Sequence, residues 1–72
     1  MKMGNDQTKV CLEGYGNYYH EAISSLNAQL RYKYNIGLIE GPHNHYYVTY
    51  KERRINVQYK KQNGIVKAYL KI

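Results

Sequence analysis

The residues of this 72-residue chain whose types could do acid-base chemistry are His43 and His45, which flank Asn44. Imidazole titrates near neutral pH, so either side chain could transfer a proton. On an extended segment both would point to the same side, with His20 and Cys11 as further candidate ligands. A zinc site needs three or four ligands in closed geometry. Only His43 and His45 have a spacing that is meaningful for such a site. We therefore predict no metal, no cofactor and no catalytic residue. The alternative for the two histidines is a solvated turn.

Positive charge is concentrated in the last third of the chain. The formal net charge is +6, and residues 51 to 72 hold seven Lys and Arg against one Glu, whereas the charges of residues 1 to 50 cancel. Such a concentration, interleaved with Tyr rings that can stack on bases, is typical of a surface that binds single-stranded nucleic acid. The predicted nucleic-acid-binding residues are Lys51, Arg53, Arg54, Lys60, Lys67, Lys71, Tyr47 and Tyr69. The alternative is that these lysines only prevent unwanted pairing at strand edges and keep the protein soluble. A/T-rich codons favour Lys and Tyr, which would account for the composition.

Residues 46 to 72 are predicted to form a three-stranded antiparallel meander. Asn63-Gly64 lies between two apolar-polar alternations, and both residues tolerate the positive φ of a type I′ turn. This turn places Gln62 opposite Ile65. Farther from the turn it predicts three apolar pairs on one face, namely Tyr59 with Ala68, Val57 with Leu70 and Ile55 with Ile72.

The first strand of the meander is predicted over residues 46 to 50. It is joined to the second by Glu52-Arg53 or, more in keeping with the absence of Gly and Asn, by a four-residue loop over residues 51 to 54. The predicted pairs are Tyr50 with Ile55, Val48 with Val57 and Tyr46 with Tyr59. The opposite face of the meander then carries Tyr47, Thr49, Lys51, Arg54, Asn56, Gln58, Lys60, Lys67, Tyr69 and Lys71. Lys60 faces Lys67 on it, a pair that an anionic partner would relieve.

One helix is predicted from Tyr18 to about Tyr34, with Asn17 as its N-cap. Its apolar stripe consists of Tyr19, Ala22, Ile23, Leu26, Leu30 and Tyr34, and it ends where Asn35 or Gly37 can adopt a left-handed conformation. Residues 1 to 16 are predicted to be a loosely ordered segment with room for a short strand, and Gly14 and Gly16 to form a flexible joint. Residues 38 to 44 are predicted to be a crossing loop. The fold class is therefore α+β in a single domain, one helix followed by a three-stranded meander.

The third strand of this meander is predicted to be a free edge that pairs with a second copy of the chain. A chain of this length buries only about 60% of its unfolded surface, and the strand is long, apolar and free of Pro. Pairing would give a homodimer with a six-stranded sheet. Its predicted interface consists of Ile65, Val66, Lys67, Ala68, Tyr69, Leu70 and Ile72. The alternative is a dimer packed through the face that carries Tyr47 and Tyr69.

Two resemblances bear on function. The first resemblance is to the HicA-type messenger-RNA interferase toxins. It lies in the order of a helix, then Gly41, His43, His45 and Tyr46, and then Arg53-Arg54-Ile55-Asn56-Val57. That resemblance implies that His43 or His45 transfers a proton and that Arg53 and Arg54 contact phosphate, although Pro42 replaces the family's Ser and no second helix closes the fold. Residues 17 to 72 resemble, in element order and Tyr content, the small SPβ-prophage Yopt family of Bacillus proteins. This second resemblance implies a phage-encoded homodimer and brings no catalytic residue.

The sequence contains no apolar run approaching the roughly 18 residues needed to span a membrane, so we predict a cytoplasmic protein without a membrane partner. Our first functional prediction is a small prophage-type binding protein that contacts nucleic acid and has no enzymatic activity. An inhibitor or modulator that binds a host protein is the alternative. A HicA-like ribonuclease toxin is the third class.

Overall fold

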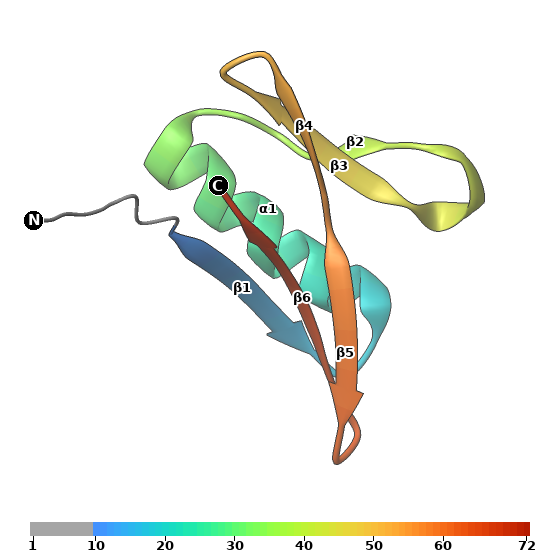
Figure 1. Ribbon diagram of the computed structural model, residues 1–72. Helices are drawn as coiled ribbons and strands as arrows, with labels where there is room; N and C mark the ends of the chain where they lie inside the picture. The colour runs from blue at the N-terminus through green and yellow to red at the C-terminus, as the bar shows by residue number, and fades with distance from the viewer. Residues whose placement is uncertain (1–9) are drawn as a thin grey trace, which may run out of the picture.

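The computed structural model describes residues 10 to 72 and shows an α+β fold with one α-helix and two small antiparallel sheets (Figure 1). Sheet A has the strand order β1 (Cys11–Gly16), β6 (Ile65–Lys71), β5 (Gln58–Gln62). Sheet B has the order β2 (Ile39–Glu40), β3 (Tyr46–Tyr50), β4 (Arg53–Asn56). The helix α1 (Tyr19–Tyr34) lies against sheet A, and a 3-10 turn (Pro42–Asn44) separates β2 from β3. Of the predicted N-terminal segment, residues 1 to 9 lie outside the described part.

The predicted helix and its end are confirmed, but the predicted stripe is fully buried only in its middle, because Tyr19 is 55% exposed and Tyr34 is partly buried. Ala22, Ile23, Leu26 and Leu30 are buried, and Asn35 adopts the left-handed conformation with φ 58°. The N-cap is Tyr18 and not Asn17. The backbone N–H of Asn17 instead donates to Glu21 Oε1 at 2.8 Å. The Glu21 carboxylate therefore accepts a hydrogen bond from a backbone amide just before the helix. Within the described residues, no helix is long and apolar enough to cross a membrane.

The predicted flexible joint at Gly14 and Gly16 is wrong, because both glycines belong to β1 and lie tightly against α1. A Cβ atom on Gly14 would overlap the backbone of Ala22 and Leu26. The glycines therefore allow strand and helix to approach closely. β1 pairs antiparallel with β6, and Leu12 opposite Leu70 joins the core.

The hairpin at Asn63-Gly64 has the predicted register near its turn. Gln62 pairs with Ile65, Tyr59 with Ala68 and Lys60 with Lys67, and the turn residues have φ of 55° and 77°. The outer predicted pairs are absent from the ladder, because the strand leaves sheet A at Val57. The N–H of Val57 donates to the Tyr46 carbonyl at 2.9 Å. β4 in sheet B and β5 in sheet A therefore follow each other with only Val57 between them, and we call residues 53 to 62 the long strand segment.

The predicted pairing between the first two meander strands is wrong by two residues. The loop contains only Lys51 and Glu52, with φ of 52° and 63°, and it places Tyr50 opposite Arg53 and Val48 opposite Ile55. A primed two-residue turn matches the twist of antiparallel strands, and this match outweighs the cost of positive φ in two residues with side chains. Since the shift is by two residues, each side chain remains on its predicted face.

The prediction that the last strand is a free edge is also wrong. β6 is the central strand of sheet A, with β1 on one side and β5 on the other. Its inward residues Val66, Ala68 and Leu70 are at most 1% exposed, because α1 covers them. A dimer cannot pair along β6 without displacing β1, so the predicted interface from Ile65 to Ile72 is not available in that form. Homodimerisation by another surface stays a prediction.

Candidate nucleic-acid interface

Strand alternation brings most of the predicted binding residues to one surface. In sheet A the buried side chains of β6 face α1, so Lys67, Tyr69 and Lys71 face away from it. Lys60 is paired with Lys67 and Gln58 with Tyr69, so both share this outward face. In sheet B the register places Tyr47, Thr49, Arg54 and Asn56 together on the face opposite the buried Val48. We call the combined outward faces of the two sheets the outer surface.

A groove joins the two sheets on this outer surface, and we call it the basic groove. It has a volume of ≈ 740 Å³ and is lined by Arg53, Arg54, Ile55, Asn56, Gln58, Tyr69, Leu70 and Lys71. Three of these side chains are cationic and none is acidic. The groove follows from the switch of sheets at Val57: β4 pairs with β3 on one edge only, and its other edge lies open beside the end of β6.

Arg54 is held in place at the sheet B end of the basic groove. Its guanidinium carbon lies 4.0 Å from the centre of the Tyr47 ring, and its Nε donates to Asn56 Oδ1 at 3.3 Å. A guanidinium stacked on a ring keeps its remaining N–H groups free in one plane, the geometry that suits phosphate oxygens. Arg54 is exposed, so this pre-positioned fork faces solvent.

Tyr69 is held similarly at the sheet A end. Lys67 Nζ lies 5.1 Å from the centre of its ring, and its hydroxyl donates to Gln58 Oε1 at 3.4 Å. The ring is only partly buried. A partly exposed aromatic ring flanked by ammonium groups can stack on an unpaired base while the lysines contact the neighbouring phosphates.

One acidic residue on the outer surface was missed in the sequence. Glu13 lies in β1 opposite Tyr69; one carboxylate oxygen accepts a hydrogen bond from the Tyr15 hydroxyl at 2.7 Å, and the other lies 3.7 Å from Lys67 Nζ. The hydrogen bond from Tyr15, with a contribution from the charge of Lys67, lowers the pKa of Glu13 below its ordinary value. The signal was the alternation of Cys11, Glu13 and Tyr15 with the apolar Leu12, which the glycines obscured.

The remaining predicted residues lie at the ends of the outer surface. Lys60 and Lys67 border a smaller hollow of ≈ 260 Å³ near the Asn63-Gly64 turn, together with Tyr15. Lys51 lies in the other turn, with Nζ 5.3 Å from the Tyr50 ring, and does not line the basic groove. The structure therefore brings together Arg54, Tyr69 and Lys71 on the outer surface, and it places Lys60 and Lys67 farther along the same face. Arg53 lines the basic groove but alternates to the face of Val48 in sheet B, and Lys51 lies apart.

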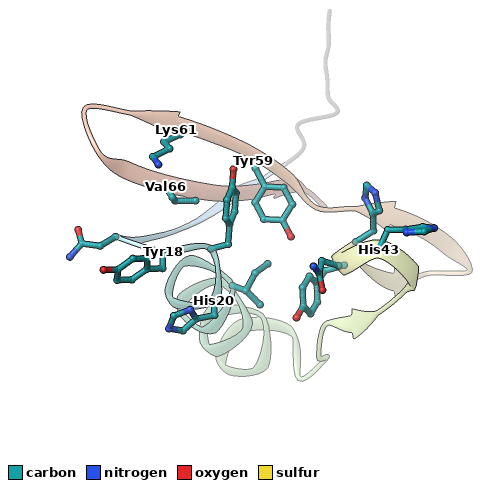
Figure 2. A pocket seen from close by; sticks show the side chains of 12 residues that line it. Tyr18, His20, His43, Tyr59, Lys61 and Val66 are labelled. Carbon is teal, nitrogen blue, oxygen red and sulfur yellow. The ribbon is translucent and has the colours of Figure 1, made fainter.

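The histidines line a different groove. The segment around His43 is a turn, which was the alternative given for the two histidines, and it is not extended. His43 and Asn44 have φ of 59° and 60°, and the Gly41 N–H donates to the His45 carbonyl at 2.6 Å. This second groove, which we call the Tyr-His groove, has a volume of ≈ 710 Å³ (Figure 2). Its lining residues are Asn17, Tyr18, Tyr19, His20, Ile23, His43, Asn44, His45, Tyr46, Tyr59, Lys61 and Val66.

The Tyr-His groove does not contain the constellation that the interferase resemblance implies. His43 and His45 line it, but Arg53 and Arg54 line the basic groove. Arg53 pairs with Tyr50, five positions along the strand from His45, which corresponds to roughly 17 Å. Among residues 10 to 72 no three His, Cys, Asp or Glu side chains are grouped so that they could hold a metal ion.

Comparison with known proteins adds no family to this geometry. No protein-family model, no curated protein and no solved structure matches the chain. The two resemblances drawn from the sequence therefore stay predictions, and the function is argued from the surface itself.

Proposed function

We propose that this protein binds single-stranded nucleic acid through its outer surface. The observation that carries the proposal is the basic groove, in which cationic side chains from β4 and β6 meet a held Tyr ring with no acidic side chain in the lining. Cationic groups spaced along a surface bind a phosphate backbone and release its counterions. The Tyr ring and the amides of Asn56 and Gln58 are suited to unpaired bases.

Lys60 and Lys67 extend the proposed path beyond the groove. They face each other across β5 and β6, and like charges in this arrangement repel. Glu13 lies 3.7 Å from Lys67, whereas the salt bridges among residues 10 to 72 include none to Lys60. A phosphate between them would relieve the repulsion. The path then runs from the Asn63-Gly64 end of sheet A, past Tyr69 and Lys71, to the Arg54 fork on Tyr47.

A single strand fits this surface better than a duplex. Duplex sequence is read by a helix or ribbon that enters the major groove, whereas the outer surface consists of sheet faces with short side-chain reach. Stacking on Tyr69 needs an unpaired base and contributes roughly 1 to 3 kcal/mol. The preference is therefore for single strands with little dependence on sequence.

The proposal is tested with two variants of equal charge. Lys60, Lys67 and Lys71 are replaced together by Gln in one variant. Arg31, Lys33 and Lys61, which lie on α1 and on the opposite face of β5, are replaced by Gln in the other. Binding of a fluorescent oligothymidylate is measured by anisotropy at low salt. We expect the first variant to bind at least about tenfold more weakly and the second to bind nearly as the parent does.

Two outcomes would reject the proposed function. One is the absence of binding by the parent protein at low salt. The other is an equal loss in both variants, which would show that only net charge matters. The slope of log affinity against log salt supplies a further check, since each phosphate contact to a single strand contributes roughly 0.7 to it. We expect that slope to fall by about 2 in the first variant only.

A further inference from the structure

The outward edge of β5 is open and lies next to the Tyr-His groove. The two-residue turn makes Gln62 and Ile65 a hydrogen-bonded pair. Alternate residues of β5 therefore bond to β6, and the backbone groups of Tyr59 and Lys61 point the other way. Val57, two residues before Tyr59, shows this direction, because its N–H bonds to Tyr46 in β3. β3 begins at Tyr46 and does not extend alongside Tyr59 and Lys61.

We propose that this edge binds an extended acidic peptide segment of a partner protein, which adds to sheet A as a further strand beside β5. The unpaired N–H and carbonyl groups of Tyr59 and Lys61 would supply main-chain hydrogen bonds to the incoming strand. Alternate side chains of that strand would enter the Tyr-His groove. The proposal is independent of nucleic-acid binding, because it uses the opposite edge of the long strand segment.

The groove wall defines what side chain it accepts. The Tyr59 ring packs edge to face on Tyr19 with centroids 5.2 Å apart, and Figure 2 shows Tyr59 between the turn that carries His43 and the start of the helix. Ile23 lies at the base of the same groove, and it is almost fully buried. An aliphatic or aromatic side chain would be covered by these rings and aliphatic groups.

The charge of the groove lining determines which residues of the partner peptide are favoured beside its apolar side chain. Lys61 is the one Lys or Arg among the lining residues, and no Asp or Glu lines the groove. An incoming Asp or Glu would therefore gain from Lys61 and meet no repulsion from the lining. A second copy of β5 is a poor occupant, because antiparallel self-pairing brings the Lys60-Lys61 pairs of two copies together.

The test begins with selection of peptides from a random library displayed on phage, with the full chain as the target. We expect enriched peptides that carry acidic residues around an apolar or aromatic residue. A synthetic peptide of the enriched sequence is then made with N-methyl groups on one or the other set of alternating amides. One set should weaken binding by roughly tenfold or more and the other should not, since only alternate amides face β5.

Two protein variants assign the site. Lys61→Pro removes an outward amide without touching a bond to β6, and we expect it to lose peptide binding while it keeps oligothymidylate binding. Lys61→Glu should weaken binding of the acidic peptide and spare the fold, so it serves if the Pro variant does not fold. The peptide should remain bound when oligothymidylate is added.

Several results would overturn the inference. These are failure of the library to enrich any peptide, equal effects of the two methylation patterns, and displacement of the peptide by oligothymidylate. Self-association of the parent that is lost in Lys61→Pro would assign the edge to a second copy instead. Failed enrichment and equal effects of the two methylation patterns leave the charge variants of the outer surface unaffected, so the two proposals can fail separately. Displacement by oligothymidylate would count against both.

Discussion

The basic groove and the Tyr-His groove lie on opposite edges of the long strand segment, residues 53 to 62, which contains β4 and β5. In β4, one edge pairs with β3 and the other edge is open beside Lys71. In β5, the opposite edge pairs with β6, and the amides of Tyr59 and Lys61 on the remaining edge are open. The basic groove has three Arg and Lys residues and a single Tyr in its lining, whereas the Tyr-His groove has four Tyr and three His residues and a single Lys. Two successive strands in different sheets thus leave two unpaired edges, and the local sequence gives each edge its own chemistry.

Substitutions at neighbouring positions of β6 distinguish the core beneath the grooves from the outer surface. We expect the largest loss of stability at the core position. Leu70 is 1% exposed in the core, whereas its neighbour Tyr69 faces outward. Leu70→Ala should lower the free energy of unfolding by about 2 to 5 kcal/mol, and Tyr69→Ala should lower it clearly less. Urea denaturation measures both. Equal losses would mean that the outer surface is covered by another element or subunit.

The close approach of β1 to α1 holds sheet A, which contributes to both grooves. Gly14→Ala should lower the free energy of unfolding by about 3 kcal/mol, because the new Cβ meets helix backbone that cannot move alone. Gly64→Ala is the matched control: it has open space around it but a φ of 77°, so a cost of about 1 kcal/mol is expected. If Gly14→Ala costs no more than the control, the packing of β1 described above is incorrect.

The sequence identified these elements unevenly, and the reasons are physical. Asn63-Gly64 was readable because both residues suit a primed turn, whereas Lys51-Glu52 adopts the same turn without either residue type. β1 was predicted only as room for a short strand, because its partner is far away in sequence, Leu12 pairing with Leu70. The switch of sheets left no local mark, since apolar residues continue to alternate through Ile55, Val57 and Tyr59.

The faces of the strands were predictable even where the pairing was not. Side chains alternate with a period of two, so a register error of two residues keeps each one on its side. The outward positions of Tyr47, Arg54, Lys67 and Lys71 were therefore anticipated. The gathering of Arg54 and Lys71 into the basic groove was not anticipated, because it depends on the switch of sheets at Val57. Glu13 was also missed, because no partner was predicted for its strand.

The two-residue loop of sheet B can be tested by replacing Lys51-Glu52 with Asn-Gly. Both positions have positive φ, which costs a residue with a side chain about 1 to 2 kcal/mol, so the replacement should raise the free energy of unfolding by about 1 to 2 kcal/mol. Thermal and urea unfolding of the two proteins give the value. A decrease would favour the four-residue loop and its different register.

The smallest effect is expected at Glu13, the one acidic residue found on the outer surface. The pKa of Glu13 is lowered by the Tyr15 hydroxyl and by Lys67, so its carboxylate is ionised at neutral pH. The contribution of this carboxylate to stability is fully present above pH 4.5, and it is lost only as the pH falls through the lowered pKa. Glu13→Gln should raise oligothymidylate affinity by roughly threefold. Tyr15→Phe should move the Glu13 pKa, followed by NMR, back toward 4.5. An affinity that falls in Glu13→Gln would contradict the proposed path.

The account is tested most directly by following backbone amide resonances during titration with oligothymidylate at low salt. The central claim is that nucleic acid occupies the outer surface and not the Tyr-His groove. We expect the shifts to concentrate at Arg54, Asn56, Gln58, Lys67, Tyr69 and Lys71, and to be small at Tyr19, His43 and Tyr59. Shifts concentrated on the second set, or none at all, would contradict the claim.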